Sequence, residues 1–172
     1  MTRIQEQTVT DPVRQKILAV YAEADAAVAQ FGPRCDASGR CCRFTEYGHT
    51  LFITHFEAEI LLEDAPPYSQ PVSRDGCPFQ VKGLCTARES RPLGCRIYFC
   101  DPTFNDRMME ITEEAIAKLK AIANEHDTGW NYAPLHHFLN AAREQGPALS
   151  APDSMNSPDS RFSLPVVPPP IG

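Results

Sequence analysis

The sequence predicts a small, mainly α-helical domain with irregular cysteine-rich loops and little strand, cross-linked by a metal site. Two observations predict this fold class. Apolar residues recur at helical spacing in several segments, and all seven cysteines fall within residues 35–100. The 172 residues fit one domain. We expect a flexible N-terminus at 1–10, a metal-binding domain at 11–146 and a disordered, proline- and serine-rich tail at 147–172.

The first helix is predicted over residues 11–31. Pro12 suits its first turn, and Gly32 and Pro33 end it. Its expected apolar face consists of Ile17, Leu18, Tyr21, Val28 and Phe31. This helix leads the chain directly to the first cysteine.

The middle of the chain is predicted to combine short elements with loops. Residues 50–64 read as a short apolar strand followed by a helix, and Thr54 with Glu57 three residues later is a capping-box pattern. A proline-rich loop is expected over 65–76. Residues 81–84 are expected to form a hairpin turn. The helix should turn three residues inward: Phe56, Ile60 and Leu61.

Two further helices are predicted after the last cysteine. The first covers residues 112–127, with Thr112 as its cap and acidic residues in its first turn. The second covers residues 133–145. Its inward-facing residues are Leu135, Phe138, Leu139 and Ala142. These stripes alone make a thin core, so a metal site joining the loops would supply the missing cross-link, and a structural metal contributes ~10 kcal/mol or more.

Charge and hydropathy exclude several classes of protein. The formal net charge of -6 and the pI of about 5.3 argue against nucleic-acid binding. No stretch reaches the ~18–20 apolar residues that span a bilayer, and no secretory signal is readable at the N-terminus. We therefore expect a cytoplasmic protein with neither nucleic acid nor membrane as a partner, in which thiols stay reduced.

The cysteines follow the spacing C-x5-C-C-x34-C-x7-C-x9-C-x4-C. A reducing compartment and the odd number of cysteines disfavour a disulfide scaffold. Unrelated buried thiols would not be confined to residues 35–100. Thiolates gathered from distant loops are what a soft or borderline metal requires. The predicted ligands are therefore Cys35, Cys41, Cys42, Cys77, Cys85, Cys95 and Cys100.

The residues around the cysteines form a recognisable series. Gly39 precedes the adjacent pair 41–42, Cys77 is followed by Pro78-Phe79, and the stretch 91–96 reads R-P-L-G-C-R before the final cysteine. In its combination of elements this series resembles the YkgJ-type cysteine-cluster family, described as zinc- or iron-chelating domains. That family carries C-x2-C-x2-C-C, then C-P-[FL], then a cysteine near R-P-x2-C-R, then a last cysteine.

The resemblance covers about residues 35–100, and it implies that the matching cysteines bind metal. One position departs from the pattern, because Ser38 stands where the second cysteine of the first element would be. Either this position is not an essential ligand, or the protein binds its metal with one ligand fewer.

Four ligands satisfy one zinc ion or one [4Fe–4S] cluster, so seven cysteines exceed one site. The surplus leaves a second ion, a labile ligand or redox thiols open. We favour an iron–sulfur cluster, because adjacent and loop-borne cysteines can wrap a large group, and zinc is the alternative. Arg91 and Arg96 are candidates for hydrogen bonding to the cluster sulfurs. The alternative is that Arg91 caps a loop and Arg96 pairs with an acid.

Chain geometry ranks the cysteines. Cys42, Cys77, Cys85 and Cys95 are predicted to be indispensable, since a glycine or proline within two residues of each of the last three directs or bends the chain there. The side chains of the adjacent Cys41 and Cys42 are expected to diverge in an extended segment. Four histidines are interpreted as ordinary loop or helix residues rather than ligands: His49, His55, His136 and His137.

The sequence leaves open whether the metal site is catalytic. No phosphate-binding loop, G-x-S-x-G or H-E-x-x-H motif is present. One alternative is a redox or methyltransferase-like enzyme, because the flagellin lysine N-methylase carries the same cysteine signature in a longer chain. The other is a zinc-stapled protein-interaction module.

Overall fold

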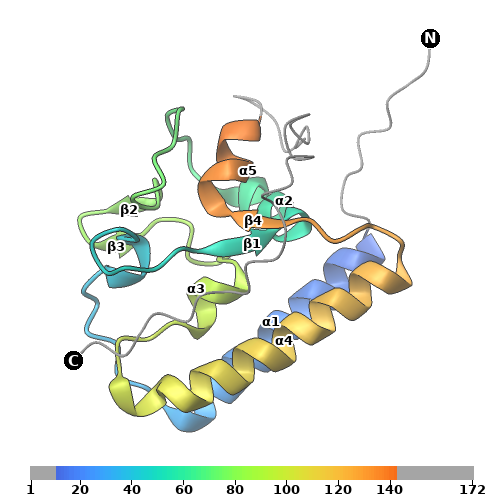
Figure 1. Ribbon diagram of the computed structural model, residues 1–172, viewed down its shortest axis with the longest axis horizontal. Helices are drawn as coiled ribbons and strands as arrows, with labels where there is room; N and C mark the ends of the chain where they lie inside the picture. Colours follow the sequence, from blue (N-terminus) through green and yellow to red (C-terminus); the bar gives the residue numbers. More distant parts are fainter. Residues whose placement is uncertain (1–10, 143–172) are drawn as a thin grey trace.

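The computed structural model describes residues 11–142, so the predictions for 1–10 and for the tail at 147–172 lie outside the described residues. Two long helices form one side of the molecule (Figure 1). Helix α1 (Asp11–Phe31) and helix α4 (Asn105–Glu125) pack side by side along their length. The predicted bounds of the first helix are confirmed. Its last residue, Phe31, is 45% exposed and so does not face inward as expected.

A compact group of short elements lies against one face of the helix pair. Strand β1 (Phe52–Thr54) pairs antiparallel with β4 (Tyr132–Pro134), and each strand leads directly into a helix, α2 (His55–Asp64) or α5 (Leu135–Ala141). The predicted capping box of Thr54 and Glu57 is present. Because β1 and β4 are so far apart in sequence, their pairing closes most of the chain into one domain.

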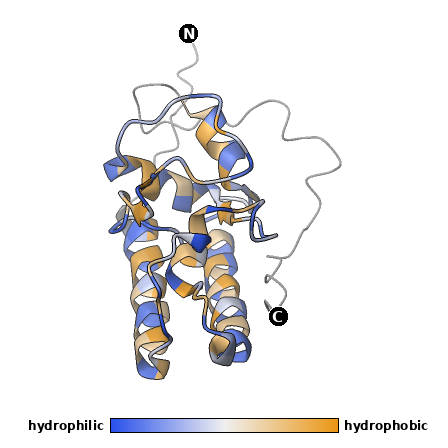
Figure 2. Cartoon of the chain, turned by 90° about the vertical axis from the view of Figure 1, so that its left-hand side faces the viewer, coloured by the Kyte–Doolittle hydropathy of each residue, from blue (hydrophilic) through white to orange (hydrophobic). Residues whose placement is uncertain are grey.

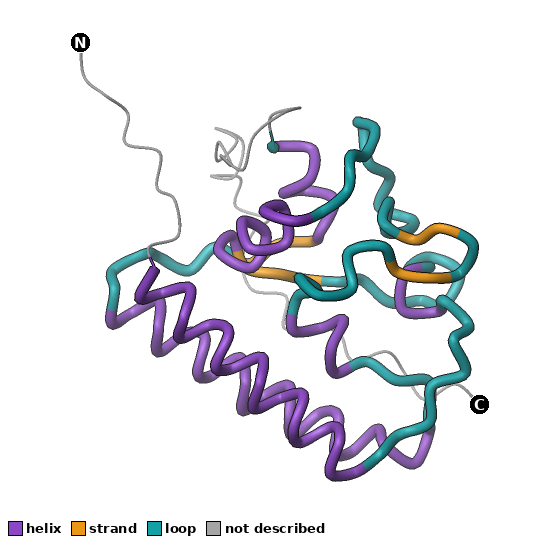
Figure 3. The backbone as a smooth tube through the Cα atoms, turned by 180° about the vertical axis from the view of Figure 1, so that it is seen from behind, coloured by secondary structure: helices purple, strands orange, loops and turns teal. Residues whose placement is uncertain are grey.

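The cysteine segments lie at the end of this group away from the β1–β4 pair, where loops dominate the backbone (Figure 3). They contain the 3-10 turn η1 (Arg40–Cys42), the hairpin strands β2 (Gln80–Val81) and β3 (Leu84–Cys85), and helix α3 (Leu93–Ile97). A second 3-10 turn, η2 (Pro102–Phe104), leads into α4. About 53% of residues 11–142 are helical, and these residues form two small antiparallel sheets, which confirms a mainly α domain with little strand.

Two apolar cores hold the domain together. The first lies between α1, α3 and α4 and includes the fully buried Ile17, Phe104 and Leu119. The second lies between α2, α5 and the hairpin and includes Phe79 and Leu139. In Figure 2, α1 and α4 alternate hydrophobic and hydrophilic residues along their length, as expected for helices with one buried face.

Three features predicted for residues 101–142 are wrong. Helix α4 begins at Asn105 rather than Thr112, because Asp101 caps η2 and η2 runs straight into the helix. Thr112 lies inside α4, and its hydroxyl donates to the carbonyl of Met108 instead of capping. The segment predicted as one helix from residue 133 begins as strand β4. The four residues expected to face inward from it are nevertheless buried: Leu135, Phe138, Leu139 and Ala142.

None of the helices within residues 11–142 combines the length and the apolar character needed to cross a membrane.

Candidate metal centre

Three segments carry the cysteines: residues 35–42, 77–85 and 91–100. A glycine shapes the first segment. Gly39 has φ +70°, in the left-handed region that favours glycine, and it begins the 3-10 turn that carries Cys41 and Cys42. A side chain at this position would collide with Gln80, whose amide donates to the Gly39 carbonyl at 2.8 Å. The first segment is thereby docked onto the β2–β3 hairpin.

The second segment is bonded to the first through its own backbone. The amide of Cys77 donates to the carbonyl of Cys42 at 2.8 Å. The hairpin then returns the chain, so that Gln80 pairs with Cys85. The predicted hairpin turn is confirmed, and it brings Cys85 back towards Cys77.

The third segment is held by a buried carboxylate. Leu93 begins α3, and its amide donates to Glu57 at 2.9 Å. Glu57 is 2% exposed, and it also accepts hydrogen bonds from Thr54 and from the hydroxyl of Tyr21. Because α3 carries Cys95, Glu57 fixes this cysteine relative to α1 and α2.

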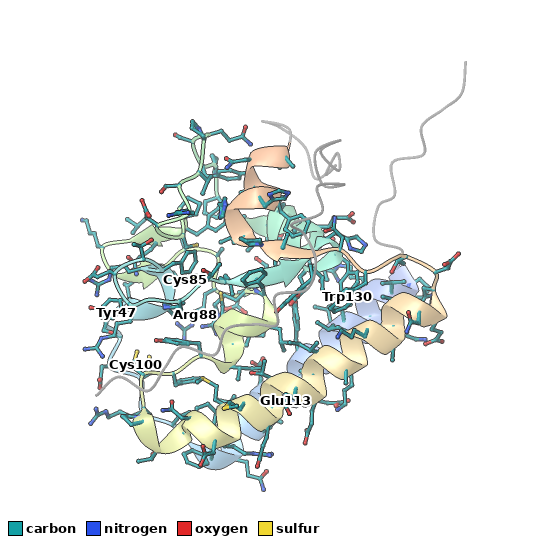
Figure 4. The ribbon with its side chains drawn as sticks, in the orientation of Figure 1. Tyr47, Cys85, Arg88, Cys100, Glu113 and Trp130 are labelled. Atoms are coloured by element: carbon teal, nitrogen blue, oxygen red, sulfur yellow. The ribbon has the colours of Figure 1, made fainter. Side chains whose placement is uncertain are left out.

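All seven cysteines line one cavity of about 170 Å³. Cys85 and Cys100 are labelled in Figure 4, at the loop-rich end of the molecule. Cys42 is buried, Cys35 is exposed, and the other five cysteines are intermediate. All seven are free thiols. The structure therefore brings together every predicted ligand, from segments more than sixty residues apart.

The thiols surround the cavity without converging on one point. Within the described residues, no group of three or more His, Cys, Asp or Glu side chains has the arrangement that one metal ion requires. The sulfurs of Cys41 and Cys42 lie 3.8 Å apart, so the expectation that they diverge is wrong. The 3-10 turn brings them together, where an extended segment would have pointed them apart.

The crowding of the thiols opposes their ionisation. A hydrogen bond with Cys42, followed by burial, raises the pKa of Cys41. The bond with Cys41 lowers the pKa of Cys42, but a bond with Cys77 and burial outweigh it and raise that pKa to about 12. Burial, followed by the charges of Cys42 and Cys41, raises the pKa of Cys95. These mutual effects show that thiols from the first and third segments lie within electrostatic reach of one another.

Three arginines share the cavity walls with the thiols: Arg40, Arg88 and Arg91. The charge of Arg91 lowers the pKa of both Cys41 and Cys95, although other effects outweigh it. The Nε of Arg91 also donates to the carbonyl of Arg88 at 3.0 Å. Arg91 therefore both holds its loop and faces the thiols electrostatically.

Arg96, the other arginine predicted to hydrogen-bond the cluster, is not among the residues that line the cavity. It pairs with Asp25 at 2.8 Å, lies over the ring of Tyr21, and donates to the carbonyls of Glu89 and Arg91. Its role in the structure is to tie the third cysteine segment to α1.

The histidines also stay outside the cavity lining. His49 comes closest, since its Nε2 lies 3.4 Å from the carbonyl of Cys41 and its ring stacks on Tyr98. Burial lowers the pKa of His49, as it does for His55. His136 and His137 lie on α5. The donors that face the cavity are therefore sulfurs rather than imidazole nitrogens.

A second, largely apolar cavity of about 80 Å³ adjoins the first. Cys41, Cys95, Leu51 and Tyr98 line both cavities. The remaining walls come mainly from apolar residues of α3 and α4. Mostly hydrophobic groups thus lie next to the thiol cavity, and a hydrophobic shell controls solvent access and local dielectric at a metal site.

The residues around the cavity fit a thiolate-bound group. A cavity needs only about 10–15 Å³ to hold one water, so the observed volume accommodates a multi-atom occupant. The Nε of Arg40 is buried and has no hydrogen-bond partner among the described residues. A buried donor of this kind needs an acceptor, and a cluster sulfur would provide one.

Sequence reasoning missed several residues of this cavity. Ser38 lines it, and its Oγ lies 3.8 Å from the sulfur of Cys100. Its place in the cysteine pattern was the available signal. Arg40 and Arg88 carried no such signal, because only the fold brings them to the cavity.

Comparisons with known proteins add nothing to this geometry. No family model, no curated protein and no solved structure matches the chain. The resemblance to the YkgJ-type family therefore stays a prediction, and any function assigned to the chain depends on the cavity.

Proposed function

We propose that this protein binds an iron–sulfur cluster through its cysteines. The observation that carries the proposal is that all seven thiols, gathered from three segments, line one cavity. Independent buried cysteines would be distributed over both cores. Here they share a single site, with three arginines beside them.

The size of the cavity and the number of its thiols favour a cluster over a single zinc ion. Zinc takes four ligands at about 2.0–2.3 Å from one point, which seven thiols exceed. In a [4Fe–4S] cluster the four thiolates bind different irons, so they stand farther apart. The cavity volume of about 170 Å³ supports the same choice.

The proposed ligands are Cys42, Cys77, Cys85 and Cys95, with Cys35, Cys41 and Cys100 as the further candidates. Cys42 and Cys77 are joined by a backbone hydrogen bond, and Cys95 is fixed through α3 by Glu57. A bound cluster would supply one-electron redox chemistry. The chain's own groups would hold it, enclose its inner side with apolar residues and donate to it from Arg40.

The test is purification of the full chain without oxygen, followed by measurement of iron, acid-labile sulfide and zinc per chain. We expect stoichiometric iron and sulfide and a visible iron–sulfur absorption. Cys95→Ala should lose both. Met109→Ala removes an exposed sulfur on α4 and is the matched control, which should retain both. If the chain carries zinc and shows no visible absorption, the bound metal is zinc rather than a cluster. If it carries neither zinc nor iron, metal binding is refuted.

A further inference from the structure

The arginines of this protein differ in whether they form an ion pair. The chain is acidic, with 22 Asp and Glu against 16 Lys and Arg. Carboxylate partners are therefore abundant. Five arginines in the described part of the chain form ion pairs: Arg14, Arg34, Arg43, Arg96 and Arg107.

Within the same residues, four arginines form no ion pair with a carboxylate, and three of these line the thiol cavity: Arg40, Arg88 and Arg91. The fourth is Arg74, which is not part of the lining. Unpaired guanidinium groups are therefore concentrated at one site. Since arginine is charged at all physiological pH values, this site favours a negatively charged occupant.

Arg88 and Arg91 lie close together on the loop before α3. The Nε of Arg91 donates to the Arg88 carbonyl, which leaves its two terminal nitrogens without an acceptor among residues 11–142. The Arg88 side chain likewise has no hydrogen-bond acceptor in the described part of the chain, and Arg88 is exposed. Figure 4 shows it in the region between Cys85 and Cys100.

Arg40 has a different environment. Its guanidinium lies 5.2 Å from the centre of the Tyr47 ring, and its Nε is buried. It is suited to compensate charge inside the cavity. Arg88 lines the same cavity but is exposed, so water screens its charge. Charge compensation of the thiol-bound group is therefore weaker from Arg88 than from Arg40, and the exposed guanidinium stays available to a second anion.

The guanidinium group presents its donors as a planar fork that matches a carboxylate or a phosphate. We propose that the open end of the thiol cavity binds a small oxyanion ligand, a carboxylate or a phosphate, between the side chains of Arg88 and Arg91. The proposal rests on the proposed function only in that the ligand would then lie beside the thiol-bound group. Such an oxyanion is the ligand class of the site.

The experiment titrates the full chain, purified without oxygen, with inorganic phosphate and separately with malonate. Calorimetry at constant ionic strength measures both. We expect one saturable site per chain for at least one of the two anions, and the preferred anion identifies the ligand class. Arg88→Gln and Arg91→Gln should each weaken binding about tenfold or more, since each removes charge-assisted hydrogen bonds. Arg74→Gln is the matched control and should bind like the natural chain.

Arg88→Lys keeps the charge and loses the fork, so its affinity should fall between those of the natural chain and Arg88→Gln. Thermal melting of each variant checks that the fold is intact. The proposal is overturned if neither anion binds saturably, or if both glutamine variants bind as well as the natural chain.

Iron and sulfide are measured in the same samples, which separates this proposal from the proposed function. Metal without arginine-dependent anion binding would refute the oxyanion site alone. Arginine-dependent anion binding without metal would refute the cluster alone.

Discussion

The half of the molecule built on α1 and α4 buries its apolar side chains along two continuous helices, whereas the half that carries the cysteines is mostly loop. In the first half the buried residues recur at helical spacing: Ile17, Tyr21, Ala24 and Val28 on α1, and Ile111, Ala115, Leu119 and Ile122 on α4. In the second half, residues 35–50 and 65–92 contain only one 3-10 turn and two strands of two residues.

The loops of the cysteine half are joined by isolated contacts. Cys77 is bonded to Cys42, and Thr45 is bonded to Asp75 through both backbone and side chain. The apolar core beneath them includes Phe79 from the hairpin and Leu139 from α5. These contacts surround a cavity instead of filling it. The helical half therefore supplies its own stability, whereas on the proposed function the cysteine half would depend on the group bound in the cavity.

If the proposed cluster is bound, its removal should have the largest effect, on the order of 10 kcal/mol for a structural site. We expect the effect to be local. Amide hydrogen exchange on the chelated chain should show lost protection in residues 35–50 and 77–100 and retained protection in α1 and α4. Equal loss of protection in both halves would contradict the claim that only the cysteine half depends on the bound group. Amide exchange that chelation leaves unchanged would contradict it too.

A cavity in the helical core should lower stability without affecting the metal. Leu119→Ala removes a side chain that is 1% exposed, and it should lower the free energy of unfolding by about 2–5 kcal/mol. Metal per chain should remain unchanged. Phe79→Ala is the matched variant in the other half, because Phe79 is similarly buried and lies between Cys77 and Cys85 in the sequence. It should lower both stability and metal content. Chemical denaturation and metal analysis measure the two effects.

Glu57 connects the two halves, and its ionisation should make stability depend on pH. Burial raises the pKa of Glu57 above its ordinary value of 4.5, although hydrogen bonds from Thr54, Leu93 and Tyr21 oppose this effect. Folding therefore favours the protonated form of Glu57 more than the unfolded chain does. As pH rises from 4.5 through the raised pKa, folding must bury a charge, and the free energy of unfolding should fall by roughly 1 kcal/mol for each pH unit in that interval.

Glu57→Gln cannot ionise, so the fall in stability over this pH range should be smaller in the variant than in the natural chain. Denaturation series across pH measure the difference between the two curves. Glu113→Gln, on the exposed side of α4, is the control and should follow the natural curve. Parallel curves for Glu57→Gln and the natural chain would show that Glu57 does not titrate differently on folding.

Local patterns predicted the elements whose structure is decided locally. The first helix, the capping box of Thr54 and Glu57 and the hairpin before Cys85 each depend on residues within a few positions of one another. The confinement of the cysteines to two clusters predicted that distant loops would meet, and the seven thiols do line one cavity. Whether they bind metal stays a prediction.

Features decided by distant contacts were missed. Strand β4 exists because it pairs with β1, some eighty residues earlier, and residues 132–134 have no alternating pattern of their own. Helix α4 starts early because η2 supplies its first turn. Arg40 and Arg88 reach the cavity only through the fold. For Arg96 the alternative that it pairs with an acid is confirmed, and only the fold identifies Asp25 of α1 as that acid.

The smallest expected effect concerns Ser38, which stands in the place of a cysteine in the family pattern. Its Oγ lies 3.8 Å from the sulfur of Cys100, and both residues line the cavity. Ser38→Cys should therefore add an eighth thiol to the same site and change stability by about 0.5 kcal/mol or less.

Alkylation with iodoacetamide, followed by mass spectrometry, counts the protected thiols. In the metal-loaded variant the count should rise by one, and chelation should expose the added thiol. Ser73→Cys, on the exposed loop before Cys77, is the control and should be alkylated with or without metal. If the thiol added at position 38 reacts as readily as the one added at position 73, residues 35–42 do not enclose the site, and the cysteine half is more open than the cavity indicates.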